Sequence, residues 1–88
     1  MGLPQIIKEY WRQARTEVQK LVAVKLMAAA ALPEFLEPCR LILTDVNTPI
    51  LVRIEAFKVL EPLAKIIPEE VSDVTILVSG LIRSMIIL

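Results

Sequence analysis

Prolines divide this chain of 88 residues into segments, and the four segments that begin at Pro4, Pro33, Pro49 and Pro68 are each long enough to hold at least one helix. Proline has no backbone N–H and a fixed φ, so it fits the first turn of a helix and disrupts the interior. These four of the chain's six prolines stand where a helix can begin. The prolines therefore predict a succession of helices.

Apolar residues recur within these segments at steps of three and four, which is typical of amphipathic helices. We expect helices from Pro4 to Gln13, from Thr16 to Ala31, from Pro33 through Leu43, from Pro49 to Ile67 and from Pro68 through Leu88. Thr16 and Thr48 can cap the second and fourth helices, whereas Pro38 should kink the third and Pro62 should bend or end the fourth. The predicted fold class is all-α, with four to five antiparallel helices in one domain over residues 1–88.

The segment 49–67 carries a polar stripe at Glu55, Lys58, Pro62 and Lys65, spaced by three, four and three. A second set of side chains lines another, apolar face: Ile50, Ile54, Phe57, Leu60, Ala64 and Ile67. This division predicts a helix with one solvent-facing side.

An internal repeat appears when the chain is shifted on itself by 33 residues. The shift pairs Lys20 with Arg53, Ala23 with Ala56, Val24 with Phe57, Lys25 with Lys58, Leu26 with Val59 and Met27 with Leu60. A competing shift of 24 places 36–38 on 60–62, but it would pair the front of one helix with the back of another. A repeat near 33 residues with two helices per unit is typical of α-solenoids.

The segment 41–60 resembles the HEAT repeat. In that family an apolar helix ends in an Asp-containing turn, followed by Val-Arg, an Ala three residues later and a Leu four after that. Here Val52-Arg53, Ala56 and Leu60 match, whereas Asp45 lies eight residues before Arg53, farther than is usual, and Asn47 takes the expected acidic place. The match is strongest over 34–60, and it implies about two HEAT-like helical hairpins, which could be a fragment of, or a cap on, a longer helical array.

The orientation of Arg53 supports a structural role. On an ideal helix it points away from the polar stripe, toward the neighbouring turns, where its guanidinium needs an acceptor. Asp45, Asn47 and the terminal carbonyls of the preceding helix are the candidates. We therefore assign Arg53 and Asp45 to the architecture rather than to a ligand.

The residue types disfavour catalysis. The chain has no histidine, and its one cysteine, Cys39, lies among apolar neighbours and can form neither an intramolecular disulfide nor a zinc cluster. Ser79 and Ser84 have no histidine to activate them. Both glycines are isolated, which excludes a glycine-rich phosphate loop.

Two clusters of acidic residues could imitate the paired carboxylates of an acid–base site or of a cation site. Each cluster follows a proline at an expected helix start: the first consists of Glu34 and Glu37, and the second of Glu69, Glu70 and Asp73. Negative charge there complements the helix dipole, which explains both clusters without a ligand. We expect no catalytic residue, no metal site, no cofactor and no enzymatic activity.

The charges are balanced over the chain but unevenly placed. Ten basic and ten acidic residues give a net charge of zero, which disfavours nucleic acid as a partner. The segment 1–25 nevertheless carries five basic and two acidic residues, or plus three. Its candidate basic patch, beside Tyr10 and Trp11, consists of Lys8, Arg12, Arg15 and Lys20. This patch could meet phosphate or an acidic protein face, or it could be a solvated surface around two packed aromatics.

The last segment is apolar around almost its whole circumference. A buried strand over 74–78 is disfavoured because no companion strand is visible, and Asp73 and Arg83 disfavour a membrane span over 71–88. A helix that is apolar all round must be covered on more than one side. We expect part of it to meet another chain, most simply a symmetric copy, at Leu77, Leu81, Met85 and Leu88.

The sequence as a whole favours a non-enzymatic protein–protein interaction or scaffold module that uses an open helical face. The alternatives are a binder of nucleic acid or of an acidic partner through the basic N-terminal helix, and a membrane-associated protein through the C-terminal helix. The unpaired cysteine and the charged N-terminal segment predict a soluble protein in the cytoplasm or another intracellular compartment. We expect a protein partner, which could be a second copy, and neither nucleic acid nor membrane.

Overall fold

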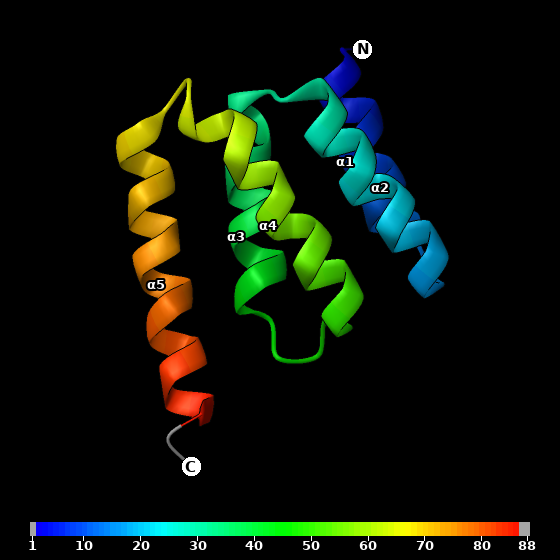
Figure 1. The fold of residues 1–88 in the computed structure, drawn as a ribbon. Helices are drawn as coiled ribbons and strands as arrows, with labels where there is room; N and C mark the ends of the chain where they lie inside the picture. The colour runs from blue at the N-terminus through cyan, green and yellow to red at the C-terminus, as the bar shows by residue number, and fades with distance from the viewer. Residues whose placement is uncertain (1, 87–88) are drawn as a thin grey trace.

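The computed structural model describes residues 2–86, and the side chains of residues 82 and 84–86 lie outside this description. The fold is all-α, as predicted. Its helices are α1 (Leu3–Gln13), α2 (Glu17–Ala30), α3 (Leu36–Thr44), α4 (Ile50–Ala64) and α5 (Pro68–Ile86), with a 3₁₀ turn, η1 (Pro33–Phe35), before α3. Successive helices run antiparallel, with α2 and α4 in front of α1 and α3, and α5 beside α3 (Figure 1).

The helices repeat with a fixed spacing. Leu3 and Leu36 begin α1 and α3, and Glu17 and Ile50 begin α2 and α4, so that both pairs of starts lie 33 residues apart. The competing shift of 24 would instead place the first turn of α3 on the last turns of α4. The starts of the first four helices therefore follow the 33-residue spacing.

The start of α2 is fixed by a capping box, which confirms the predicted role of Thr16. Its side-chain oxygen accepts from the N–H of Gln19 at 3.1 Å, and the Gln19 side-chain oxygen accepts from the N–H of Thr16 at 3.2 Å. Each side chain thus satisfies a backbone donor that a helix start leaves free. At the other end Ala31 adopts a left-handed conformation with φ 51°, which ends α2.

The prediction that Thr48 caps α4 was wrong. Pro49 occupies the capping position in an extended conformation, and α4 begins at Ile50. The carbonyl of Pro49 accepts from the N–H groups of Val52 and Arg53 at 3.0 and 3.1 Å. The fixed φ of proline therefore sets the entry into α4 without a side-chain cap.

Pro38 also acts differently from the prediction, whereas Pro62 lies where α4 ends, as expected. Pro38 does not kink a long helix, because the turn Pro33–Phe35 precedes α3 and leaves Pro38 as the third residue of α3. A backbone N–H has no intrahelical acceptor at that position, so its absence costs nothing. Pro62 lies in the last turn of α4, which ends at Ala64 rather than at Ile67.

The core lies where α2, α3, α4 and α5 meet. Its largest fully buried side chains are Phe35, Met27, Leu63, Val24, Val52, Val59 and Cys39. The apolar face predicted for α4 is not the buried one. Its residues Ile50, Ile54 and Phe57 are exposed, and of the predicted residues that lie within the helix only Leu60 is buried. The helix is apolar on nearly every side, and its neighbours cover the side that holds Val52, Val59 and Leu63.

The last helix, α5, packs on the core through Val71, Val74 and Val78, which are buried. The stretch considered as a possible strand is helical. Within the part of the chain that the structure describes, no helix has both the length and the apolar character that a membrane crossing requires.

Candidate binding cleft

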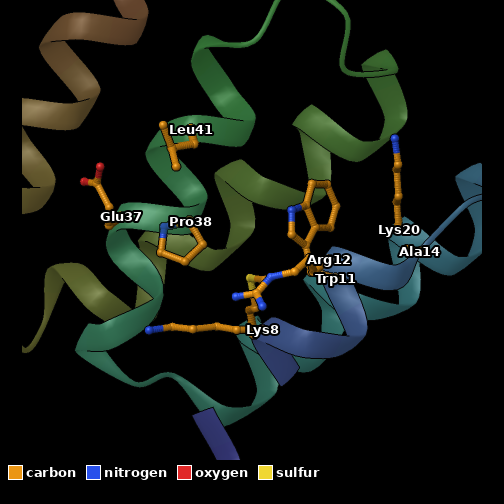
Figure 2. Close-up of a pocket in the computed structure, with 9 residues that line it drawn as sticks. Lys8, Trp11, Arg12, Ala14, Lys20, Glu37, Pro38 and Leu41 are labelled. Carbon is orange, nitrogen blue, oxygen red and sulfur yellow. The ribbon is translucent and has the colours of Figure 1, made fainter. Parts of the chain in front are cut away.

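A cleft of about 610 Å³ opens between α1, α2 and α3 (Figure 2). Cationic and apolar side chains make up most of its wall. The lining residues are Lys8, Trp11, Arg12, Ala14, Lys20, Met27, Glu37, Pro38 and Leu41. Its volume lies within the range of small-molecule binding sites.

Trp11 forms the centre of the cleft. It is partly buried and packs against the hydrophobic core, which holds its ring in place. The ammonium group of Lys20 lies 5.9 Å from the ring centroid, within range of a cation–π interaction. Figure 2 shows the ring between Lys20 on one side and Pro38 on the other. The capping box holds the first turn of α2, and with it Lys20, in this position.

Two further cations come from α1. Lys8 and Arg12 are one helical turn apart and both line the cleft. Arg12 forms an ion pair with Glu9 at 3.0 Å, with three quarters of its side chain exposed. Lys8 is half-buried and has no acidic partner among the described residues. Lys20 likewise has no carboxylate partner in the described part of the chain.

The opposite wall belongs to α3 and carries one carboxylate. Glu37 forms an ion pair with Arg40, whose hydrogen bonds hold the pKa of the Glu37 carboxyl below its ordinary value. Figure 2 shows this carboxylate turned away from Trp11. Its charge is therefore matched by Arg40, and it does not neutralise Lys8 or Lys20.

The structure brings three of the four residues of the predicted basic patch into one cleft. Arg15 is not among the lining residues, and its backbone N–H donates to the Gln19 side chain at 2.8 Å. Pro38 and Leu41 also line the site but were not predicted, because nothing in the local pattern relates α3 to α1.

The predicted contact of Arg53 is present. Its guanidinium donates to the backbone carbonyl of Asp45, while the Asp45 carboxylate accepts from the N–H of Asn47 at 2.9 Å. The Nε–H of Arg53 is buried and has no acceptor among the described residues. Arg53 thus ties α4 to the turn that precedes it, through a carbonyl rather than a carboxylate.

The remaining candidates form no reactive site. Cys39 is fully buried, its thiol donates to the carbonyl of Ala56 at 3.0 Å, and burial raises its pKa to about 12. A thiol in this state is not a nucleophile at neutral pH. Among the described residues, no three cysteine or acidic side chains converge as metal ligands would.

The predicted partner-binding residues of α5 can be placed in part. Leu77 and Leu81 are 45% and 39% exposed, on consecutive turns of the helix. The side chain of Met85, and Leu88 as a whole, lie outside the described residues.

The cleft combines positive charge with an apolar floor. Lys8, Arg12 and Lys20 can bind anionic groups, and Trp11, Pro38 and Leu41 can contact an apolar group between them. The chain matches no protein-family model, no curated protein and no solved structure.

Proposed function

We propose that this chain is a non-enzymatic protein-interaction module built from HEAT-like helical hairpins. Two antiparallel hairpins with a common 33-residue spacing support this proposal, as do the packing of α2 along α4 and of α5 along α3. An array of this kind presents whole helix faces to solvent, and such faces are suited to protein partners.

The observation that carries the proposal is a set of exposed apolar side chains on the outer sides of α2 and α4. On α2 these are Val18, Val22 and Leu26, and on α4 they are Ile50, Ile54 and Phe57. We call these six residues the outer apolar face. The spacing of three and four places each group on one side of its helix.

The outer apolar face points away from the core. With 3.6 residues per turn, the α2 group lies opposite Val24 and Met27, and the α4 group lies opposite Val52 and Val59. Single exposed apolar residues are normal on a monomer, whereas rows on two neighbouring helices are typical of a binding surface. We therefore assign this face to a protein partner.

A pair of substitutions tests the assignment. Leu26→Gln with Ile54→Gln removes the apolar surface at the centre of each row without adding charge. We expect the immobilised variant to lose the partner that the wild-type chain captures from its native source, because burial of these side chains drives the association.

The matched control is Lys25→Gln with Lys58→Gln, which changes two exposed residues on the same helices. The control should retain the partner, and circular dichroism should be the same for all three proteins. Equal capture by the Leu26→Gln/Ile54→Gln variant and the wild type would assign the contact to another surface.

A further inference from the structure

We infer that the cleft around Trp11 binds an acidic peptide segment that carries an apolar anchor side chain. The inference rests on the proposed function in that the partner is a protein, but it concerns a different surface from the outer apolar face.

The charges of the cleft select an anion. Lys8 and Lys20 are half-buried and have no acidic partner among the described residues, whereas the one carboxylate in the wall, Glu37, is already paired with Arg40. A half-buried ammonium group interacts more strongly with an incoming carboxylate than a fully exposed one does. Arg12, one turn from Lys8 and largely exposed, can exchange Glu9 for a partner carboxylate.

The apolar part of the cleft selects the anchor. Trp11, Pro38 and Leu41 give the cleft its accessible apolar wall, and Leu41 is more than half exposed. Trp11 is backed by the core, so its ring offers a preformed surface that loses little entropy on binding. A leucine or phenylalanine side chain placed there would cover this surface while acidic neighbours reach Lys8 and Lys20.

A peptide fits the cleft better than a nucleic acid does. The chain has a net charge of zero, so it lacks the long-range attraction that polyanion binding requires. The Lys20 ammonium already lies over the Trp11 ring, which hinders the stacking of a base on that side.

Trp11 is the one tryptophan of the chain, and its fluorescence therefore reports on the cleft alone. The probe is a short peptide in which glutamate and leucine alternate, titrated into the full chain at low salt. We expect a saturable change in tryptophan fluorescence. Lys8→Glu with Lys20→Glu should weaken binding by about tenfold, because two favourable charge pairs become repulsive.

The control variant, Lys25→Glu with Lys65→Glu, makes the same change in net charge at exposed sites outside the cleft. It should bind the peptide as the wild type does. Lys8→Gln with Lys20→Gln provides a milder form of the test, and circular dichroism checks that each variant is folded.

Three results would overturn the inference. Equal binding of a peptide with glutamine in place of glutamate would show that the cleft does not recognise charge. A fluorescence response to oligothymidylate but not to the peptide would assign the cleft to nucleic acid. No fluorescence response to either probe would show that the cleft binds neither ligand. The proposed role of the outer apolar face would be unaffected, because Leu26→Gln with Ile54→Gln tests it separately.

Discussion

The thiol of Cys39 shows how a single residue links α3 to α4. It is fully buried and donates to the carbonyl of Ala56, which is itself fully buried, so the two helices approach closely at small side chains. Burial disfavours the thiolate and raises the Cys39 pKa from the ordinary value of 9.0 to about 12. The folded state therefore holds the thiol proton more tightly than the unfolded chain does.

This difference predicts a specific pH dependence of stability. Below pH 9 the contribution of Cys39 is fully present, and between pH 9 and about 12 the unfolded chain loses the proton while the folded chain keeps it. The free energy of unfolding should then fall by about 1.4 kcal/mol per pH unit from this group. Urea titrations of the wild type and of Cys39→Ala across this range isolate the effect, because the variant lacks the thiol. If the free energy of unfolding depended on pH in the same way in both proteins, the pKa shift of Cys39 would be contradicted.

At the scale of a helix, the capping box of α2 supports both the fold and the cleft. Thr16 satisfies a backbone donor at the start of α2, and Lys20 follows one turn later. Thr16→Ala should lower the free energy of unfolding by about 1 kcal/mol, since the Gln19 N–H loses its acceptor. The measurement is urea unfolding followed by circular dichroism.

Thr75→Ala is the matched control for this prediction. Thr75 lies inside α5, where its hydroxyl donates to the carbonyl of Val71 and caps nothing. Alanine has the better helix propensity, so this variant should be as stable as the wild type or slightly more so. Similar losses in both variants would mean that the capping box contributes nothing of its own.

The helices themselves were predictable from local signals, but their buried sides were not. Prolines and Thr16 mark helix starts through backbone chemistry that acts within a few residues, and each observed helix begins within three residues of one of them. In α4 the apolar residues surround the helix, so periodicity could not distinguish Ile54 and Phe57, which are exposed, from Val52 and Val59, which are buried. The neighbouring helices make that choice.

The candidate site was predictable to the same extent. Lys8, Arg12 and Lys20 could be grouped with Trp11 because they lie close together in the sequence, on consecutive helices. Pro38 and Leu41 complete the cleft only because α4 packs along α2 and holds α3 beside the first hairpin, which no local pattern encodes. The sequence therefore indicated the charge of the site but neither its shape nor its apolar wall.

The whole molecule is flat and exposes more surface than its mass requires. Its extents are 43 × 30 × 14 Å, and its accessible surface is 5862 Å². A compact monomer of 9.9 kDa would expose about 5,200 Å². The excess is consistent with helices that are covered on one side and open on the other, and α5 is such a helix.

The exposed side of α5 predicts self-association. Leu77 and Leu81 lie on consecutive turns, are exposed, and continue the stripe expected to meet a symmetric copy. Sedimentation equilibrium at micromolar concentration should give twice 9.9 kDa for the wild type. Leu77→Glu with Leu81→Glu should give a monomer of unchanged helicity, because carboxylates buried in the interface would oppose the contact. The control is Ser79→Glu, which changes a residue on another side of the same helix and should leave the protein dimeric. A monomeric wild type would show that this stripe stays open to solvent. Unfolding of the double variant would instead place both leucines in the core, where substitution by glutamate cannot be tolerated.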